Sequence, residues 1–349
     1  MTIFLQAFSV IVGIGFLVFI HELGHFIAAK ICKVKVLTFA FGLGPDLIKK
    51  THNGTKYCIK LIPFGGFVAM AGENPYKVTG LKDEYLSLKW YKKIFVAFSG
   101  SFLNYIFAIF IFAMFFSMCG ISVTSKDPFI GSTIKNYPAA LSGLMSGDKI
   151  KSIDGVKINA WNDLNINLKN KVNKMTSFIV ERRNNSFQVN IFVQKNPATQ
   201  SGIIGINPVL VKMKIGFFRS FYLGLKVSIA QTTATIMHLW NKIISFENPD
   251  VVGPVGVIHI MLNAFKNGIC SYIKLIAFIS IALGLFNLLP IPMLDGGMIM
   301  LFFVEGIRKK QLKMRFIQIY NMIGLIFVIV VFAFATWNDL ARLSSHNYK

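Results

Sequence analysis

The chain has few acidic residues and little charge overall, and this scarcity excludes most soluble protein classes. Among 349 residues, 15 are Asp or Glu against 37 Lys or Arg, and charged residues amount to 15%. Hydrophobic residues make up 54%, and the mean hydropathy is +0.57. This balance is typical of a polytopic membrane protein. The net charge of +22 does not indicate a nucleic-acid partner, because the basic residues are spread over loops beside apolar runs, as membrane-flanking charge is.

Cysteine is also scarce and is scattered along the chain. The four cysteines, Cys32, Cys58, Cys119 and Cys270, have no paired spacing, so neither a disulfide framework nor a cysteine zinc site follows from them. The N-terminus lacks a basic n-region and a small-residue cleavage site. We therefore expect residues 1–30 to be a retained span and not a signal peptide.

Long apolar runs are the feature that the chain has in abundance. Four segments are long and apolar enough to span a membrane, namely 3–29, 94–118, 271–294 and 316–337. A fifth segment, 215–245, mixes charged and polar side chains with apolar ones. We expect it to form one or two amphipathic helices on the membrane or against the bundle, and whether it spans stays open.

The charge of the loops predicts an orientation. The loops 30–93 and 305–315 are rich in Lys and Arg, so both should face the cytoplasm. Four spans place these two loops on the same side and both termini outside. The intervening region, 119–214, would then also lie outside, because long domains translocate largely regardless of their charge.

Residues 119–214 read as a separate β-rich unit. Gly143-Leu144, then Gly147-Asp148-Lys149-Ile150 and Ile153-Asp154-Gly155, indicate short strands and tight turns, and the pattern resembles a PDZ domain of the bacterial protease type. We expect four regions: two spans with a cytoplasmic or re-entrant β-loop over 1–118, a PDZ domain over 119–205, an amphipathic membrane-associated segment over 206–265, and two spans over 266–349.

The first span carries the strongest chemical signal, His21-Glu22-Leu23-Gly24-His25. On a helix, His21 and His25 share one face, where two imidazoles can ligate zinc, and Glu22 beside them can act as a general base. Ionisable groups within a span are costly and usually mark a function. A purely structural polar cluster between helices remains an alternative.

A catalytic zinc usually takes three protein ligands, and Asp295 is the candidate for the third. At 1.5 Å per residue, His21 and Asp295 both reach the cytoplasmic half of the bilayer in the four-span topology. Pro290 and Pro292 break the third span and can turn the carboxylate inward. On spacing alone, Asp295 could equally end its helix at the interface.

These motifs together resemble the site-2 protease family of intramembrane zinc metalloproteases, most closely its bacterial regulator-of-sigma-E protease branch. The resemblance rests on H-E-x-G-H, the PDZ-like insertion and Asn287-Leu288-Leu289-Pro290-Ile291-Pro292-Met293-Leu294-Asp295-Gly296-Gly297. It implies one zinc ion held by His21, His25 and Asp295, with Glu22 as the catalytic base.

The resemblance also implies a fold and an activity. The fold is a polytopic α-helical membrane protein with four transmembrane helices, a membrane-associated β-hairpin loop and one inserted PDZ domain. The activity is cleavage of transmembrane segments of single-span proteins, such as anti-sigma factors or signal-peptide remnants. The expected location is the bacterial inner membrane, with the PDZ domain periplasmic, the active site towards the cytoplasm and no nucleic-acid partner.

Two segments are expected to bind substrate. The family implies that a hairpin around Thr55–Met70 pairs with an extended substrate, which would place Ile59, Leu61, Gly65 and Gly66 at the contact. An ordinary cytoplasmic hairpin is the alternative. Asn287, Pro290 and Pro292 complete the expected substrate-binding set, the prolines through the geometry that they impose. Asn287 could instead bond backbone freed by Pro290.

Other features leave alternatives open. Relatives often have G-P-x-x-N in the second span, where this chain has Gly100-Ser101-Phe102-Leu103-Asn104, so the local helix geometry is in question. Asn104 is expected to be a helix–helix contact. The segment Ile130–Ile134 could bind a C-terminus, or the PDZ domain could act as a size filter. A transporter is disfavoured because no inverted repeat is apparent, and a dead scaffold because H-E-x-x-H is intact.

Overall fold

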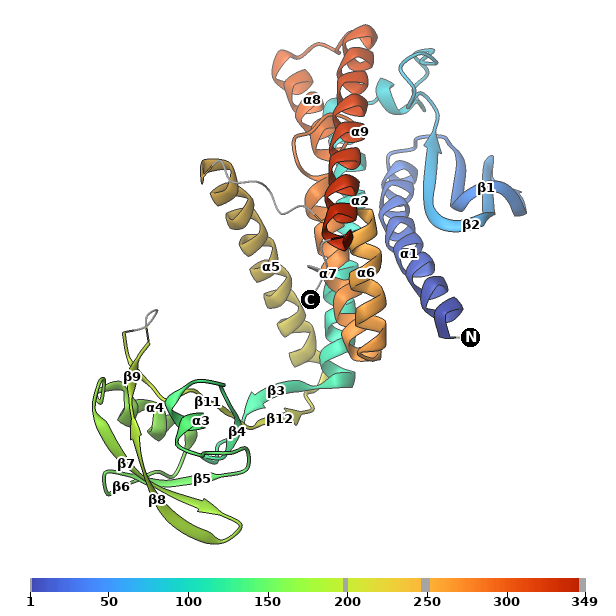
Figure 1. Cartoon of the computed structure of the whole chain (residues 1–349). Helices are drawn as coiled ribbons and strands as arrows, with labels where there is room; N and C mark the ends of the chain where they lie inside the picture. Colours follow the sequence, from blue (N-terminus) through green and yellow to red (C-terminus); the bar gives the residue numbers. More distant parts are fainter. Residues whose placement is uncertain (1, 197–199, 246–251, 345–349) are drawn as a thin grey trace. The chain divides into compact units, whose positions relative to one another are not determined.

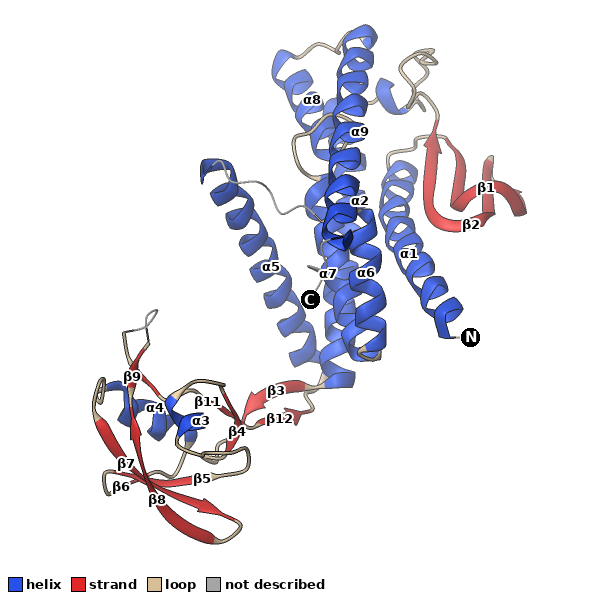
Figure 2. Ribbon diagram, viewed as in Figure 1, coloured by secondary structure: helices blue, strands red, loops and turns tan. Residues whose placement is uncertain are grey.

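The computed structural model describes residues 2–196, 200–245 and 252–344 (Figure 1). The chain divides into two compact units. One comprises Met1–Ser117 with Gly216–Lys349, and the other comprises Met118–Ile215. The first is built mainly of helices and the second mainly of strands (Figure 2).

Seven helices of more than ten residues form the first unit within the described part of the chain. They are α1 (Thr2–Ile31), α2 (Trp90–Cys119), α5 (Phe217–Ser245), α6 (Pro254–Lys266), α7 (Ile269–Asn287), α8 (Asp295–Arg308) and α9 (Met314–Ser344). Four contain segments long and apolar enough to cross a membrane: Phe8–Ile31, Trp90–Cys119, Ile269–Asn287 and Met314–Arg342. The prediction of four transmembrane helices is confirmed, and α5 is one continuous helix outside this set.

The third predicted span, 271–294, is wrong at its C-terminal end. Helix α7 stops at Asn287, and residues 288–294 form a turn before α8 begins at Asp295. Pro290 and Pro292 cannot donate helical hydrogen bonds, and Met293 adopts a left-handed φ of 75°. Asp295 is therefore the first residue of a new helix and does not end the span.

A long β-hairpin lies beside α1 in Figure 1. Its strands, β1 (Val36–His52) and β2 (Thr55–Met70), pair antiparallel with several register shifts. The turn residues Asn53 and Gly54 both have positive φ, as a type I′ turn requires. Phe19 of α1 packs its ring against Phe39 and Phe41, which fixes the hairpin to the helix two residues before His21.

One apolar core underlies the histidine-bearing end of α1. It joins α1, the hairpin, the short 3-10 helix η1 (Tyr85–Ser87), α2, α8 and α9. Its buried members include Ala28, Val36, Leu86, Val96 and Phe302. Such a core fixes the relative positions of the helices that carry the candidate site.

The second unit is β-rich, as expected. Its elements are β3 (Ile121–Thr124), β4 (Ile130–Thr133), α3 (Pro138–Leu141), β5 (Lys149–Ile153), β6 (Val156–Lys157), α4 (Trp161–Lys169), β7 (Met175–Arg182), β8 (Asn185–Phe192), β9 (Gln194–Lys195), β10 (Gly202–Ile203), β11 (Ile206–Pro208) and β12 (Leu210–Met213). A four-stranded sheet has the order β6-β5-β7-β8. Ile130, Ile150 and Phe178 are fully buried in its core.

Two details bear on the expectations from sequence. Strand β4 already pairs with β11, and the N–H and carbonyl of Ile130 bond to the backbone of Asp148 and Gly147, so the strand that was expected to bind a C-terminus is partly occupied. Cys32 and Cys58 are free thiols.

Candidate metal centre

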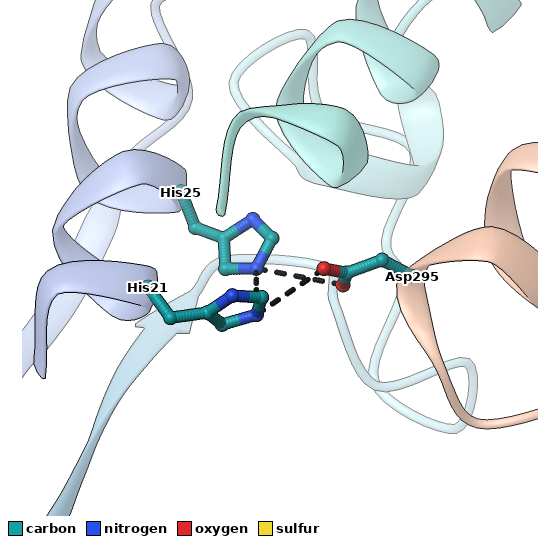
Figure 3. Close-up of side chains that lie close together, drawn as sticks. All are labelled: His21, His25 and Asp295. Atoms are coloured by element: carbon teal, nitrogen blue, oxygen red, sulfur yellow. Dashed lines mark hydrogen bonds and ion pairs between the residues drawn. The ribbon is translucent and has the colours of Figure 1, made fainter. Parts of the chain in front are cut away.

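Three side chains from two helices that are far apart in the sequence converge in the first unit (Figure 3). His21 and His25 project from consecutive turns of α1, and Asp295 projects from the start of α8. The two histidine Nε2 atoms are 3.1 Å apart. His21 Nε2 lies 3.2 Å from Asp295 Oδ2, and His25 Nε2 lies 3.4 Å from Asp295 Oδ1. Among the described residues this is the one group of three such side chains that could hold a metal ion.

The spacing of these atoms fits zinc. Ligands placed tetrahedrally at about 2.0–2.1 Å from the ion lie about 3.3 Å from one another. The Nε2–Nε2 separation of 3.1 Å and the separations of 3.2 Å to Oδ2 and 3.4 Å to Oδ1 are close to that value, and with one ligand atom from each residue all three atoms lie within 4.8 Å of one another. Two histidines and one carboxylate are also a donor set that catalytic zinc uses, with a fourth position open.

The hydrogen bonds on the far side of the His25 ring support this fit. His25 Nδ1 lies 2.8 Å from the carbonyl oxygen of Val96, and a carbonyl only accepts. Nδ1 therefore carries the proton, and the Nε2 lone pair is free for a metal.

His21 has an equivalent partner in Asn104. Its Nδ1 lies 3.2 Å from the assigned amide nitrogen of Asn104, while Asn104 Oδ1 is buried without a partner among the described residues. Exchanging the amide oxygen and nitrogen lets Oδ1 accept from Nδ1–H. The Nε2 lone pairs of both histidines then face each other and the Asp295 carboxylate. The two histidine residues are only 7–8% exposed, so water does not offset the repulsion, and a cation between these atoms would stabilise them.

Two glycines let α1 and α2 approach closely enough to make these contacts. A Cβ atom on Gly24 would lie 2.3 Å from the carbonyl oxygen of Ser99. A Cβ atom on Gly100 would lie 2.4 Å from His25 Nε2, inside the space between the ligand atoms. Any larger residue at position 100 would compete with a metal ion for that space.

Glu22 lies beside the three ligand residues and is held by the hairpin. Its Oε2 accepts a hydrogen bond of 3.0 Å from the backbone N–H of Val68 on β2. Glu22 lines a cleft of about 420 Å³ together with both histidines, Asp295 and Asn287. A carboxylate, three ligand side chains and an amide thus meet in one cavity.

Of the predicted substrate-binding residues, Asn287 lines this cleft and the others do not. Asn287 reaches it, with its amide nitrogen 3.5 Å from His21 Nε2. Pro290 is exposed in the turn that follows. Pro292 packs on α9, where a Cβ atom on Gly324 would lie 2.5 Å from it.

The hairpin candidates lie along β2. Gly65 and Gly66 lie on the strand beside Val18 and Phe19 of α1. Ile59 lines a second, apolar cavity of about 500 Å³ between α1 and the hairpin. Leu61 is 54% exposed.

Three polar residues that line the cleft were not predicted as site residues from the sequence: Glu73, Tyr85 and Asn321. Asn321 had a signal, because a polar amide within a predicted span is a functional candidate. Glu73 was a rare acid directly after a strand. Tyr85, which is buried, carried no signal that distinguishes it from a core aromatic.

The chain is similar to a known protein family and to several known proteins. The chain matches the model of Peptidase family M50 over residues 9–331. It is 31% identical to the Campylobacter jejuni protein Cj1068, over 97% of this chain and 94% of that protein. It is 27% identical to the regulator of sigma-W protease RasP of Bacillus subtilis, over 95% of this chain and 97% of that protein.

The chain is also similar to a second RasP protein and to a solved PDZ domain. The zinc metalloprotease RasP of Bacillus licheniformis is 27% identical over 94% of this chain and 97% of its own length. Among solved structures, a PDZ domain of an SdrC-like protein from Listeria monocytogenes is 23% identical, with a TM-score of 0.23, covering 26% of this chain and 94% of that chain.

Proposed function

Because the chain belongs to peptidase family M50 and is a membrane zinc metalloendopeptidase, we propose that it hydrolyses peptide bonds within transmembrane segments of single-span proteins. The observation that carries this proposal is the convergence of His21, His25 and Asp295 beside Glu22 in a bundle with four candidate spans. The two histidines and Glu22 lie within the candidate span Phe8–Ile31.

His21, His25 and Asp295 would hold the zinc ion. Bound there, zinc acts as a Lewis acid that polarises the scissile carbonyl and makes water more acidic. Glu22 accepts the proton of the attacking water and later delivers it to the leaving amine, so that water is consumed and no other proton donor is needed. The bond from Val68 N–H orients the Glu22 carboxylate for both transfers.

Substrate has to be unwound before it can react, because a helix occupies its own carbonyl groups in hydrogen bonds. Among the strands that the structure describes, the end of strand β2, residues 66–70, pairs with β1 on one side only and offers an extended partner for an unwound segment. The β2 residues Ile59, Leu61, Ile62 and Phe64 are 45–54% exposed, which supports a role in contacting an apolar peptide. Gly65 and Gly66 continue this strand towards Val68, and the Asn287 amide can bond a substrate carbonyl at the cleft.

We place the protein in a bacterial inner membrane, with the lysine-rich loops on the cytoplasmic side and the β-rich unit outside. The unit built around the sheet β6-β5-β7-β8 would bind a substrate terminus as a PDZ domain or exclude substrates with bulky outer domains. Anti-sigma factors and signal-peptide remnants are the substrate classes that suit such a site.

The test is a Glu22→Gln variant in the same membranes as the native chain. We expect loss of at least about a hundredfold in cleavage of a single-span substrate, because a general base contributes about 10²–10⁴-fold. Zinc should stay near one ion per chain, since Glu22 is not a ligand. The matched control is Glu181→Gln in the β-rich unit, where the carboxylate pairs with Lys151 at 2.7 Å. Full cleavage by Glu22→Gln would reject the mechanism.

A further inference from the structure

One face of α2 contacts all three candidate ligands. The Val96 carbonyl accepts from His25, Asn104 bonds His21, and the Ser101 hydroxyl donates to Asp295 Oδ2 at 3.4 Å. Ser101 and Asn104 are three positions apart and share one side of the helix, whereas Val96 contacts His25 through its backbone carbonyl. Ser101 and Asn104 are fully buried, so these contacts are made away from solvent.

The same face begins with a buried ion pair to α8. Lys93 Nζ donates to both carboxylate oxygens of Glu305, at 2.8 and 3.1 Å. Lys93 is 1% exposed and Glu305 is 4% exposed. The Lys93 ammonium also lies 5.3 Å from the centre of the Phe302 ring. Both groups are therefore paired, although neither takes part in the proposed chemistry.

Stability alone is a poor explanation for this pair. Two charges lose their hydration on burial, and apolar residues of similar volume often replace such a pair with no loss of stability. The best-attested benefit of a buried polar pair is specificity, because it selects one register between two elements. The register at issue here is that of α8 against α2.

Two contacts join α8 to α2, one towards each end of α8. They are the Lys93–Glu305 ion pair and the Ser101–Asp295 hydrogen bond, and we call them the two ties. Glu305 lies ten residues after Asp295, or about 15 Å along the helix axis. On α2, Lys93 and Ser101 are about 12 Å apart by the same measure. Gly306 packs beside the first tie, where a Cβ atom would lie 2.6 Å from the Trp90 ring. Two ties at this separation restrict both sliding and rotation of α8.

The position of Asp295 depends on that restriction. Its helix follows the irregular turn 288–294, and besides the contacts with α2 the first turn of α8 is held by the Tyr320 hydroxyl, which donates to the Gly297 carbonyl at 3.0 Å. A ligand must be held within about 0.5 Å of its productive position. The histidines share one helix and need no such device.

We propose that Lys93, Glu305 and Ser101 are positioning residues for the third zinc ligand. The ion pair sets the register of α8 on α2, and the Ser101 hydroxyl orients the Asp295 carboxylate towards the histidines. This inference rests on the proposed zinc site. It concerns metal affinity and does not depend on which substrate is cleaved.

The test measures zinc affinity and stability in the full-length, detergent-solubilised protein. The double variant Lys93→Met/Glu305→Met removes the tie without leaving a lone buried charge. We expect thermal stability to be retained while the zinc dissociation constant, measured by competition with a chromophoric chelator, rises about tenfold to a hundredfold, as for other positioning contacts. The Co²⁺-loaded variant should lose absorption intensity typical of four-coordinate sites. Lys151→Met/Glu181→Met is the control pair.

Smaller changes separate positioning from mere structure. Lys93→Arg keeps the charge and should keep zinc affinity within about threefold of the native value. Ser101→Ala should weaken zinc affinity by about twofold to fivefold. Should the apolar pair not fold, Glu305→Asp keeps both charges and shortens the tie by one methylene, and it should still weaken zinc binding by about threefold or more.

The outcomes distinguish this inference from the proposed function. Native protein that binds no zinc would reject both. The native protein could bind one zinc ion while the variants bind zinc with dissociation constants within about twofold of the native value. That result would support the zinc site and overturn the positioning role. Reduced stability with unchanged zinc affinity would identify the pair as structural only.

Discussion

The contact between α1 and α2 makes Gly100→Ala a sharp test of the metal centre. The added Cβ would lie 2.4 Å from His25 Nε2, 2.7 Å from His25 Cε1 and 2.9 Å from His21 Cε1. Ordinary van der Waals contacts need about 3.5 Å or more, so the rings must shift by about 1 Å. Moving the helices apart to relieve this clash would also loosen the close contact of Gly24 with Ser99 and Gly100 across the same interface.

Two costs follow from this shift. Overpacking of this kind destabilises folded proteins by about 1–3 kcal/mol. Displacing the His25 ring also strains its bond to the Val96 carbonyl, and loss of such a partner weakens metal binding by about tenfold to a hundredfold, or about 1.4–2.8 kcal/mol. We therefore expect Gly100→Ala to bind zinc at least about tenfold more weakly than the native chain.

The assay combines chelator competition for zinc with thermal unfolding of the zinc-free protein. Gly216→Ala is the matched control, because a Cβ at Gly216 meets no atom within 4 Å and its backbone has no positive φ. The control should leave zinc binding unchanged. If Gly100→Ala binds zinc as tightly as the control does, the ligand geometry derived from the two helices is wrong.

Two further predictions concern groups around the site. Asn104→Ala should weaken zinc binding by about tenfold to a hundredfold, because His21 loses the acceptor that fixes its tautomer; chelator competition checks this, and unchanged affinity would reject the exchanged amide. The hydroxyl and N–H of Thr79, with the N–H of Gly80, lower the pKa of Glu84 from 4.5 to about 2. Its contribution to stability is therefore present above about pH 4.5 and is lost as the pH falls towards 2. Unfolding temperatures should fall less steeply with acid in Glu84→Gln, and equal slopes would contradict this.

The local part of the site was predictable from sequence because helix periodicity determines it. His21 and His25 are four residues apart in an apolar run, so their shared face follows from the helix geometry. Asp295 needed long-range information. Two prolines indicated a break near it, but its partnership with the histidines came from the family resemblance, and its place at the start of a new helix came from the structure.

The groups that orient the ligands had no comparable signal. The Val96 partner is a backbone carbonyl, which every residue type provides. Lys93 belongs to a lysine-rich end of a span and was counted as flanking charge, although its side chain is buried against Glu305. Asn104 was expected to be a helix–helix contact, and its contact does cross from α2 to α1, where it reaches His21, a proposed zinc ligand.

The arrangement explains how a site can be held in place when its ligands come from separated segments. Each ligand residue sits on a helix, and α2 contacts every one of them although it contributes no ligand. Rigid elements hold a constellation more accurately than loops do. Asp295 comes from a segment far from the histidines in the sequence, and a buried ion pair joins its helix to α2. Because apolar side chains would serve packing equally well there, the buried charges are best explained by the register that they impose.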